Sequence, residues 1–180
     1  IGDALASFNN TREYPVWGFG AKFNDTVRHI FQLGPSSTVS GVEGVLEAYK
    51  SVFRSDLVMS GPTVFLQVIQ AAALRARKYH QSMEQCRRYC VLLIITDGMV
   101  DDVEETQRKL QVYRELPLSV VIIGVGRADF RRMNILCNQP AKTSFVAFRQ
   151  HQHDPSSMAK AALENLPHDI VQYMSTNLAL

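Results

Sequence analysis

Two uninterrupted apolar runs constrain the fold of this chain more than any other feature of its sequence. Residues 90–96 read CVLLIIT, and residues 118–125 read LSVVIIGV. Each run has the length of a strand, and a strand without polar alternation is typical of a parallel sheet that helices cover on both faces. We therefore predict two strands that are each buried on both faces.

The segments around these runs alternate between strand and helix patterns. Apolar residues at three- and four-residue steps predict an amphipathic helix over 42–53, and a Gly-Pro break before residue 64 predicts that a second helix follows to about residue 81. Further helices are predicted at 101–115, 129–136, 156–166 and 167–174, and further strands at 14–23, 27–33 and 144–149. This order predicts an α/β fold with an open, mostly parallel sheet and helices on both faces.

The totals limit the class of protein. A length of 180 residues fits one domain, residues 1–180. The net charge of +2, from 19 basic and 17 acidic residues, argues against nucleic acid as a partner. No apolar run approaches the roughly 18 residues of a membrane span. Three cysteines are too few for a disulfide framework, which favours a reducing compartment such as the cytoplasm.

The first residues read as the end of a helix. Ile1, Leu5 and Phe8 are spaced as one apolar helical stripe, and no capping residue precedes them. We therefore expect the chain to begin inside a helix, as a piece of a longer protein.

Two oxygen-bearing side chains follow predicted elements where an α/β sheet binds its ligands, at the carboxyl ends of its strands. Asp97 directly follows the run CVLLIIT, and Thr63 lies in a Gly-Pro turn before a helix. A carboxylate and a hydroxyl suit Mg²⁺ or a similar cation, which keeps several waters. Two structural alternatives stay open: Thr63 could cap the helix, and Asp97 could belong to an ordinary turn. Asp101 and Asp102 are better explained as helix-start residues beside the helix dipole.

Six segments in order resemble the copine family over nearly the whole chain. They are YPVWGFGAKF, SGVEGVLEAY, SGPT, LLIITDGMVDDVEET, LPLSVVIIGVGRADF and a tail that runs from FVAFRQ to LENLPHDIVQYM. The resemblance implies a Rossmann-like von Willebrand factor A fold with a metal-ion-dependent adhesion site for Mg²⁺ or Mn²⁺. GPT matches the family's metal-binding threonine at Thr63, and TDG matches its aspartate at Asp97.

The same resemblance implies that part of the family's site is absent from this chain. In that family, the main metal-binding loop, of the type Asp-x-Ser/Thr-x-Ser, follows a central first strand. Both are missing here and would lie upstream of Ile1. We therefore expect a sheet that lacks its first central strand, and a metal site that is incomplete in these residues.

The resemblance also implies a function. The chain would be a non-catalytic protein-interaction domain whose metal is completed by an acidic side chain of the protein partner. The parent protein would carry calcium-dependent modules that bind anionic phospholipid. Such a protein would be cytoplasmic and would move to the plasma membrane when calcium rises. Those modules, which would use Ca²⁺, are absent from these 180 residues.

Two alternatives remain. A ubiquitin ligase with a copine-like domain would carry a zinc-binding RING downstream, and no Cys-x-x-Cys pair occurs before Leu180. A nucleotide-binding α/β enzyme would need a phosphate loop, but neither Gly18-x-Gly20 nor Gly124-x-Gly126 completes the GxGxxG pattern. Because no serine or cysteine is recognisably placed with a base either, we expect that the chain is not an enzyme.

Overall fold

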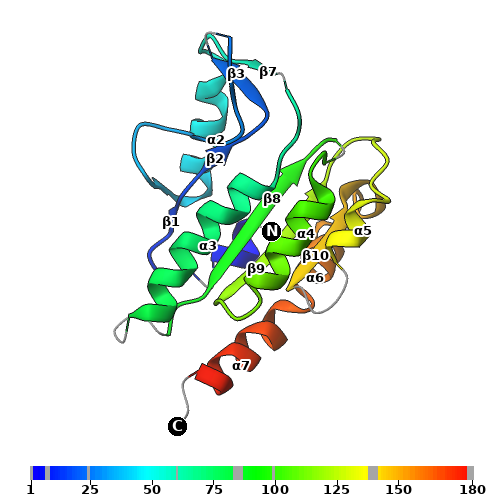
Figure 1. Cartoon of the computed structure of the whole chain (residues 1–180). Helices are drawn as coiled ribbons and strands as arrows, with labels where there is room; N and C mark the ends of the chain where they lie inside the picture. The colour runs from blue at the N-terminus through cyan, green and yellow to red at the C-terminus, as the bar shows by residue number, and fades with distance from the viewer. Residues whose placement is uncertain are drawn as a thin grey trace. The chain divides into compact units, whose positions relative to one another are not determined.

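The chain folds into two compact units, Ile1–Val64 and Phe65–Leu180 (Figure 1). The computed structural model describes all residues except 1, 7–8, 24, 60, 83–86, 99, 138–141 and 178–180. Ile1 and Phe8 of the predicted first helical stripe therefore lie outside the described residues. Leu5 belongs to a short helix, α1 (Gly2–Ala6).

The first unit is built from short antiparallel ribbons and one long helix. Strand pairs β1–β6 and β2–β5 stand beside a three-stranded group in the order β4-β3-β7. The strands are β1 (Glu13–Tyr14), β2 (Trp17–Gly18), β3 (Ala21–Phe23), β4 (Thr26–Arg28), β5 (Phe31–Gln32), β6 (Val39–Ser40) and β7 (Val58–Met59).

The predicted continuous strands over 14–23 and 27–33 are wrong, because each is divided into shorter pieces. Pro15 has no N–H to give to a ladder, and Gly20 adopts a φ of +70° between β2 and β3. Both features interrupt strand pairing. The three pieces β1, β2 and β3 pair in turn with β6, β5 and β4, so the chain reverses after β3 and not within residues 14–23.

The long helix of the first unit, α2 (Gly41–Val52), confirms the predicted amphipathic helix to within about one residue. Ala48 is buried on its inner side. Leu46, Tyr49 and Phe53 are exposed, and the rings of Tyr49 and Phe53 meet edge to face with centroids 5.1 Å apart.

The second unit contains the predicted parallel sheet. Its strands are β8 (Cys90–Thr96), β9 (Leu118–Gly124) and β10 (Thr143–Ala147), arranged in the order β10-β9-β8 with both pairs parallel. The register is continuous, with Ile94 opposite Ile122 and Val146 opposite Ile123. The open α/β sheet predicted from the two apolar runs is therefore confirmed.

Helices cover both faces of this sheet (Figure 1). On the near face, α3 packs on β8 and β9, and α4 lies between α3 and α5. On the far face, α6 packs on β9 and β10. The bounds are α3 (Leu66–Gln81), α4 (Val103–Val112), α5 (Met133–Leu136), α6 (Pro155–Leu163) and α7 (Leu166–Asn177), with a 3₁₀ turn at Phe148–Gln150.

The two apolar strands differ in burial, which corrects one prediction. β9 is buried at all seven positions. β8 is not buried on both faces, since Ile95 is 58% exposed and Val91 and Leu93 are half-buried. Among the described strands, β8 pairs with β9 alone, whereas β9 has a neighbouring strand on each side.

Three other elements end or begin at residues that differ from those predicted. The helix expected from residue 101 begins at Val103 and ends at Val112. The helix expected over 129–136 is reduced to α5, because the Asp129 carboxylate accepts the backbone N–H and the guanidinium of Arg131 and holds a turn there. The last strand ends at Ala147 instead of residue 149.

Candidate functional site

Asp97 lies where the sequence predicts, at the carboxyl end of β8. The preceding Thr96 is buried, and its carbonyl oxygen accepts a 2.8 Å hydrogen bond from the backbone N–H of Val125. The chain then leaves the sheet, and the Asp97 side chain is exposed. It forms no hydrogen bond or ion pair with the described residues. The carboxylate is therefore accessible to a ligand from outside the unit.

Thr63 is half-buried and lies in the irregular segment that ends the first unit. Helix α3 begins at Leu66 with Phe65 as its N-cap residue, so Thr63 lies two residues before that position. Thr63 and Asp97 belong to different units. Their meeting at one cation stays a prediction.

Asp102 holds the start of α3 in place of a local capping residue. Its Oδ1 accepts the backbone N–H of Phe65 at 3.0 Å, and its Oδ2 accepts the N–H of Leu66 at 2.8 Å. Oδ2 also accepts the hydroxyl of Thr106 at 3.0 Å. A carboxylate at a helix N-terminus satisfies free N–H groups and offsets the positive end of the dipole.

This role was not foreseen for Asp102. The sequence assigns it to the start of its own helix, and it does stand at the N-cap of α4, but its carboxylate makes no side-chain cap there. The sequence does indicate that α3 lacks a cap of its own. No Ser, Thr, Asp or Asn stands at its N-cap, and its first turn has no acidic residue. A helix that lacks its own cap needs one from elsewhere.

No cluster of carboxylates or imidazoles surrounds Asp97. Within the part of the chain that the structure describes, no three His, Cys, Asp or Glu side chains gather into a group that could hold a metal ion. Among the described residues, Asp97 is therefore not part of a group of three or more such side chains.

A second polar cluster lies at the amino ends of the strands. The Ser119 hydroxyl donates to Asp169 Oδ2 at 2.7 Å and stands 2.9 Å from the Tyr89 hydroxyl. Burial raises the pKa of Tyr89, so this phenol stays protonated. Lys142 Nζ donates to the carbonyl of Leu116 at 3.1 Å, and burial lowers the pKa of this lysine.

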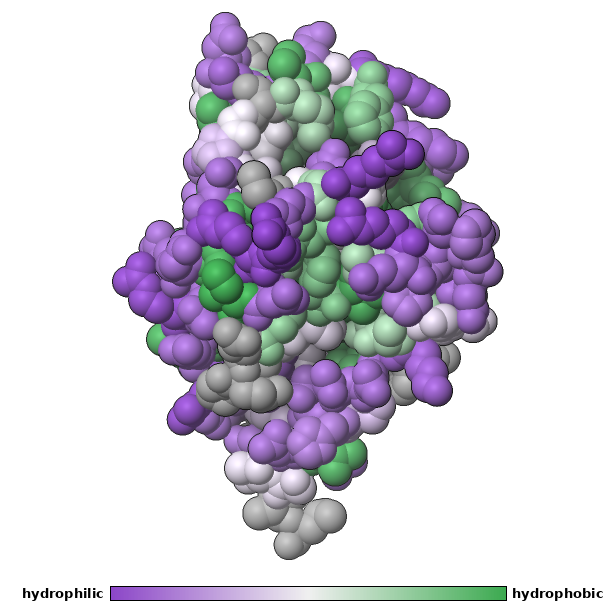
Figure 2. All heavy atoms as spheres, turned by 90° about the vertical axis from the view of Figure 1, so that its right-hand side faces the viewer, coloured by the Kyte–Doolittle hydropathy of each residue, from purple (hydrophilic) through white to green (hydrophobic). Residues whose placement is uncertain are grey.

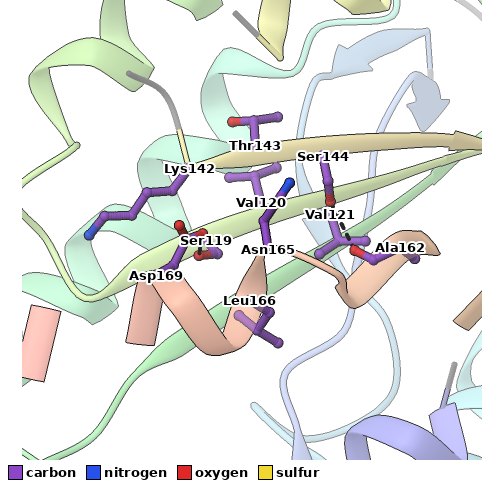
Figure 3. Close-up of a pocket in the computed structure, with 10 residues that line it drawn as sticks. All are labelled: Ser119, Val120, Val121, Lys142, Thr143, Ser144, Ala162, Asn165, Leu166 and Asp169. Atoms are coloured by element: carbon purple, nitrogen blue, oxygen red, sulfur yellow. Dashed lines mark hydrogen bonds between the residues drawn. The ribbon is translucent and has the colours of Figure 1, made fainter. Parts of the chain in front are cut away.

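Ser119, Lys142 and Asp169 of this cluster line a cavity of about 20 Å³ (Figure 3). Ser119 and Asp169 point toward each other there, and Ser144 donates to the carbonyl of Ala162 at 3.0 Å. The volume holds about one water molecule. The cluster lies at the strand ends opposite to Asp97 and fastens α6 and α7 to the sheet, so we assign it a structural role.

None of the described helices has the length and apolar character needed to cross a bilayer. The two glycine pairs weighed as phosphate loops have backbone roles. Gly124 is the last residue of β9, and the rings of Phe130 and Phe145 leave no room for a side chain there. Gly126 takes a φ of +78° in the turn that follows.

Comparison with known proteins identifies the family. The copine family model matches residues 1–179. The chain is 37% identical to Protein BONZAI 1 of Arabidopsis thaliana over 193 residues, which cover 97% of this chain and 33% of that protein. It is 35% identical to Protein BONZAI 2 of the same plant, with 97% and 32% covered, and 32% identical to Copine-E of Dictyostelium discoideum, with 98% and 32% covered.

The chain thus spans about a third of the length of these curated relatives. The match runs through the short ribbons of the first unit and the parallel sheet of the second. The chain belongs to the copine family.

Proposed function

We propose that this chain is a non-catalytic protein-interaction domain that binds its partner through a cation at Asp97. The observation that carries the proposal is the position of that carboxylate. It is exposed at the carboxyl end of a parallel strand, where open α/β sheets bind ligands, and it is not engaged by the described residues.

The donor groups fit a hard cation that is weakly held. Asp97 supplies one carboxylate and Thr63 a hydroxyl, and Mg²⁺ is commonly bound by one or two carboxylates with water at the other positions. Mn²⁺ accepts the same oxygen ligands. With a single acidic ligand we expect a dissociation constant on the order of millimolar, as in the weakest oxygen-ligand sites.

A weak cation site suits a protein-recruitment role. A cation with one protein carboxylate keeps positions that an acidic side chain of a partner can fill. The partner's carboxylate and the cation then increase each other's affinity, because the two bindings are linked.

For the whole protein we propose the properties of a copine. Calcium-binding modules outside these 180 residues would attach it to anionic phospholipid at the plasma membrane when calcium rises. This domain would then bring a bound protein to the membrane. Membership of the copine family and the match over residues 1–179 support this proposal.

The test is a Mn²⁺ titration of the 180-residue chain followed by amide NMR. We expect paramagnetic broadening of the Thr96, Asp97 and Gly98 signals that EDTA reverses. Addition of a small dicarboxylate such as glutarate, as a substitute for the partner's side chain, is expected to raise the affinity for Mn²⁺ several-fold.

Matched variants separate a specific site from general attraction of cations. Asp97→Asn is expected to abolish the local broadening, whereas Asp129→Asn, at another exposed carboxylate, leaves it unchanged. Thr63→Ala is expected to weaken Mn²⁺ binding, and Thr63→Ser to retain it. Equal broadening in wild-type and Asp97→Asn chains would contradict the proposal.

A further inference from the structure

Asp102 connects the two segments that carry the predicted cation ligands. It follows Asp97 in the segment that leaves β8 and enters α4. Its two carboxylate oxygens accept the backbone N–H groups of Phe65 and Leu66, which come shortly after Thr63 in the sequence. One side chain therefore attaches the start of α3 to the segment that begins with Asp97.

Helix α4 can pack in only one orientation, which fixes the position of its N-cap residue Asp102. Val103 and Thr106 of this helix are buried. The side of the unit that carries α5 is rich in hydrophilic residues (Figure 2), and Glu104 of α4 pairs there with Arg132 at 2.7 Å. A helix with one buried and one charged side has a single stable orientation on the core.

The Asp102 carboxylate itself is restrained by its neighbours. Val100, just before it in the chain, is 1% exposed. The hydroxyl of Thr106, one turn further along α4, donates to Asp102 Oδ2 at 3.0 Å. The side chain is thus oriented by contacts within its own segment, and it presents its oxygens to α3 at defined places.

The start of α3 restricts Thr63 in turn. Phe65 is fully buried, and its backbone is helical, with φ of −88° and ψ of −25°. The covalent chain keeps the Cα atoms of Thr63 and Phe65 within about 7 Å of each other. Fixing Phe65 therefore removes most of the positions that Thr63 would otherwise occupy.

We propose that Asp102 is a positioning residue for the cation site, because it holds the start of α3 so that the Thr63 hydroxyl can share a cation with Asp97. This inference rests on the proposed function and explains how two ligands that are far apart in the sequence would reach one ion. Asp102 is not itself assigned as a ligand, since both of its oxygens already accept hydrogen bonds.

A purely structural cap would behave differently. Its loss would lower the stability of the fold, but the chains that remain folded would bind cations as before. A positioning residue changes the order of Thr63 and the affinity for the cation even when every chain is folded. The two roles are therefore separated by measurements on fully folded variants.

Amide NMR of the metal-free chain tests the first consequence. In Asp102→Ala, the backbone order parameter of Thr63 is expected to fall from a rigid value of about 0.85 to below about 0.6, whereas that of Val100 stays unchanged. Asp102→Asn keeps one acceptor oxygen, so an intermediate value is expected. Ser119→Ala, which removes hydrogen bonds at the opposite ends of the strands, is the matched control and should leave Thr63 ordered.

Mn²⁺ titration of the same variants tests the second consequence. Asp102→Ala is expected to weaken Mn²⁺ binding several-fold, by the same factor as Thr63→Ala. The chain with both substitutions should bind no more weakly than either single variant, since both remove the same ligand. Ser119→Ala should bind Mn²⁺ as the wild-type chain does. Circular dichroism checks folding, and Asp102→Asn replaces Asp102→Ala in both measurements if the latter does not fold.

The two measurements distinguish failure of this inference from failure of the proposed function. A wild-type chain without affinity for Mn²⁺ contradicts the proposed function, and the order of Thr63 in the metal-free variants then decides the role of Asp102. A Thr63 backbone as ordered in Asp102→Ala as in wild type overturns the inference. Losses of Mn²⁺ affinity that multiply in the double variant would also overturn it.

Discussion

The Asp102 carboxylate accepts the backbone N–H of Leu66 at 2.8 Å, although 36 positions separate the two residues in the sequence. One side chain at the start of α4 thus completes the start of α3. Because the chain between them includes all of β8, this contact closes the loop that holds the first strand of the sheet against its helix.

Asp102→Ala is expected to destabilise the chain by about 2 kcal/mol, since it leaves two N–H groups at a helix start without their charged acceptor. Urea unfolding followed by circular dichroism measures the change. Glu105→Ala, at an exposed acid in the first turn of α4, is the control and should cost less than about 1 kcal/mol. Equal losses in the two variants would show that Asp102 acts only through its charge.

Ser119→Ala removes the hydroxyl that bonds to Asp169 and Tyr89. Both partners are then left in a partly buried site without it, and we expect a loss of about 1–3 kcal/mol of unfolding free energy. Ser175→Ala, at an exposed serine of α7, should change stability by less than about 0.5 kcal/mol. A neutral Ser119→Ala variant would mean that water replaces the hydroxyl in the adjoining cavity.

Gly124→Ala is expected to cost about 1–3 kcal/mol, because a Cβ there would lie 2.9 Å from the rings of both Phe130 and Phe145. Gly98→Ala is a matched control just after β8, where no atom of the described residues other than its chain neighbours lies within 4 Å of the added Cβ. Thermal melts of the two variants, compared with wild type, measure the difference. Similar melting temperatures for both would show that the two rings move aside without cost.

Burial raises the pKa of the Cys137 thiol from 9.0 to about 11. The folded state therefore holds this proton more tightly than the unfolded state. The resulting stability is present below pH 9 and is lost as the pH rises toward 11. In a chain with Cys86→Ser and Cys90→Ser, alkylation of Cys137 at pH 9 should be roughly fiftyfold slower when folded than in urea. Equal rates in the two states would contradict the assigned burial.

The sequence predicts the second unit better than the first. Both apolar runs become strands, and β8 has the predicted bounds. An apolar run of this length, with no polar residue to face solvent, is hard to place anywhere but in a buried strand. The segment around Trp17 and Gly18 has strand-forming residues too, but Pro15 and Gly20 divide it, and short ribbons depend on tertiary pairing that composition does not reveal. The exposure of Ile95 likewise depends on which elements cover β8, and a local apolar pattern does not give that.

The sequence predicts only those features of the candidate site that depend on neighbouring residues. Asp97 is found because it directly follows a strand, and the end of a parallel strand is where ligands bind. The role of Asp102 is not found, since its acceptor atoms serve Phe65 and Leu66 from far along the chain. The residues near Asp102 in the sequence do not reveal this contact. The missing cap of α3 indicates only that some distant group is needed, without identifying it.

Strand β9 is buried at all seven positions between two neighbouring strands and two helical layers. Substitution there has to conserve volume as well as hydrophobicity, because no side chain of the strand can expand into solvent. In a saturation library of this chain, β9 should therefore tolerate the fewest amino acids. Along β8, tolerance should rise and fall with every second residue, and it should be greatest at position 95.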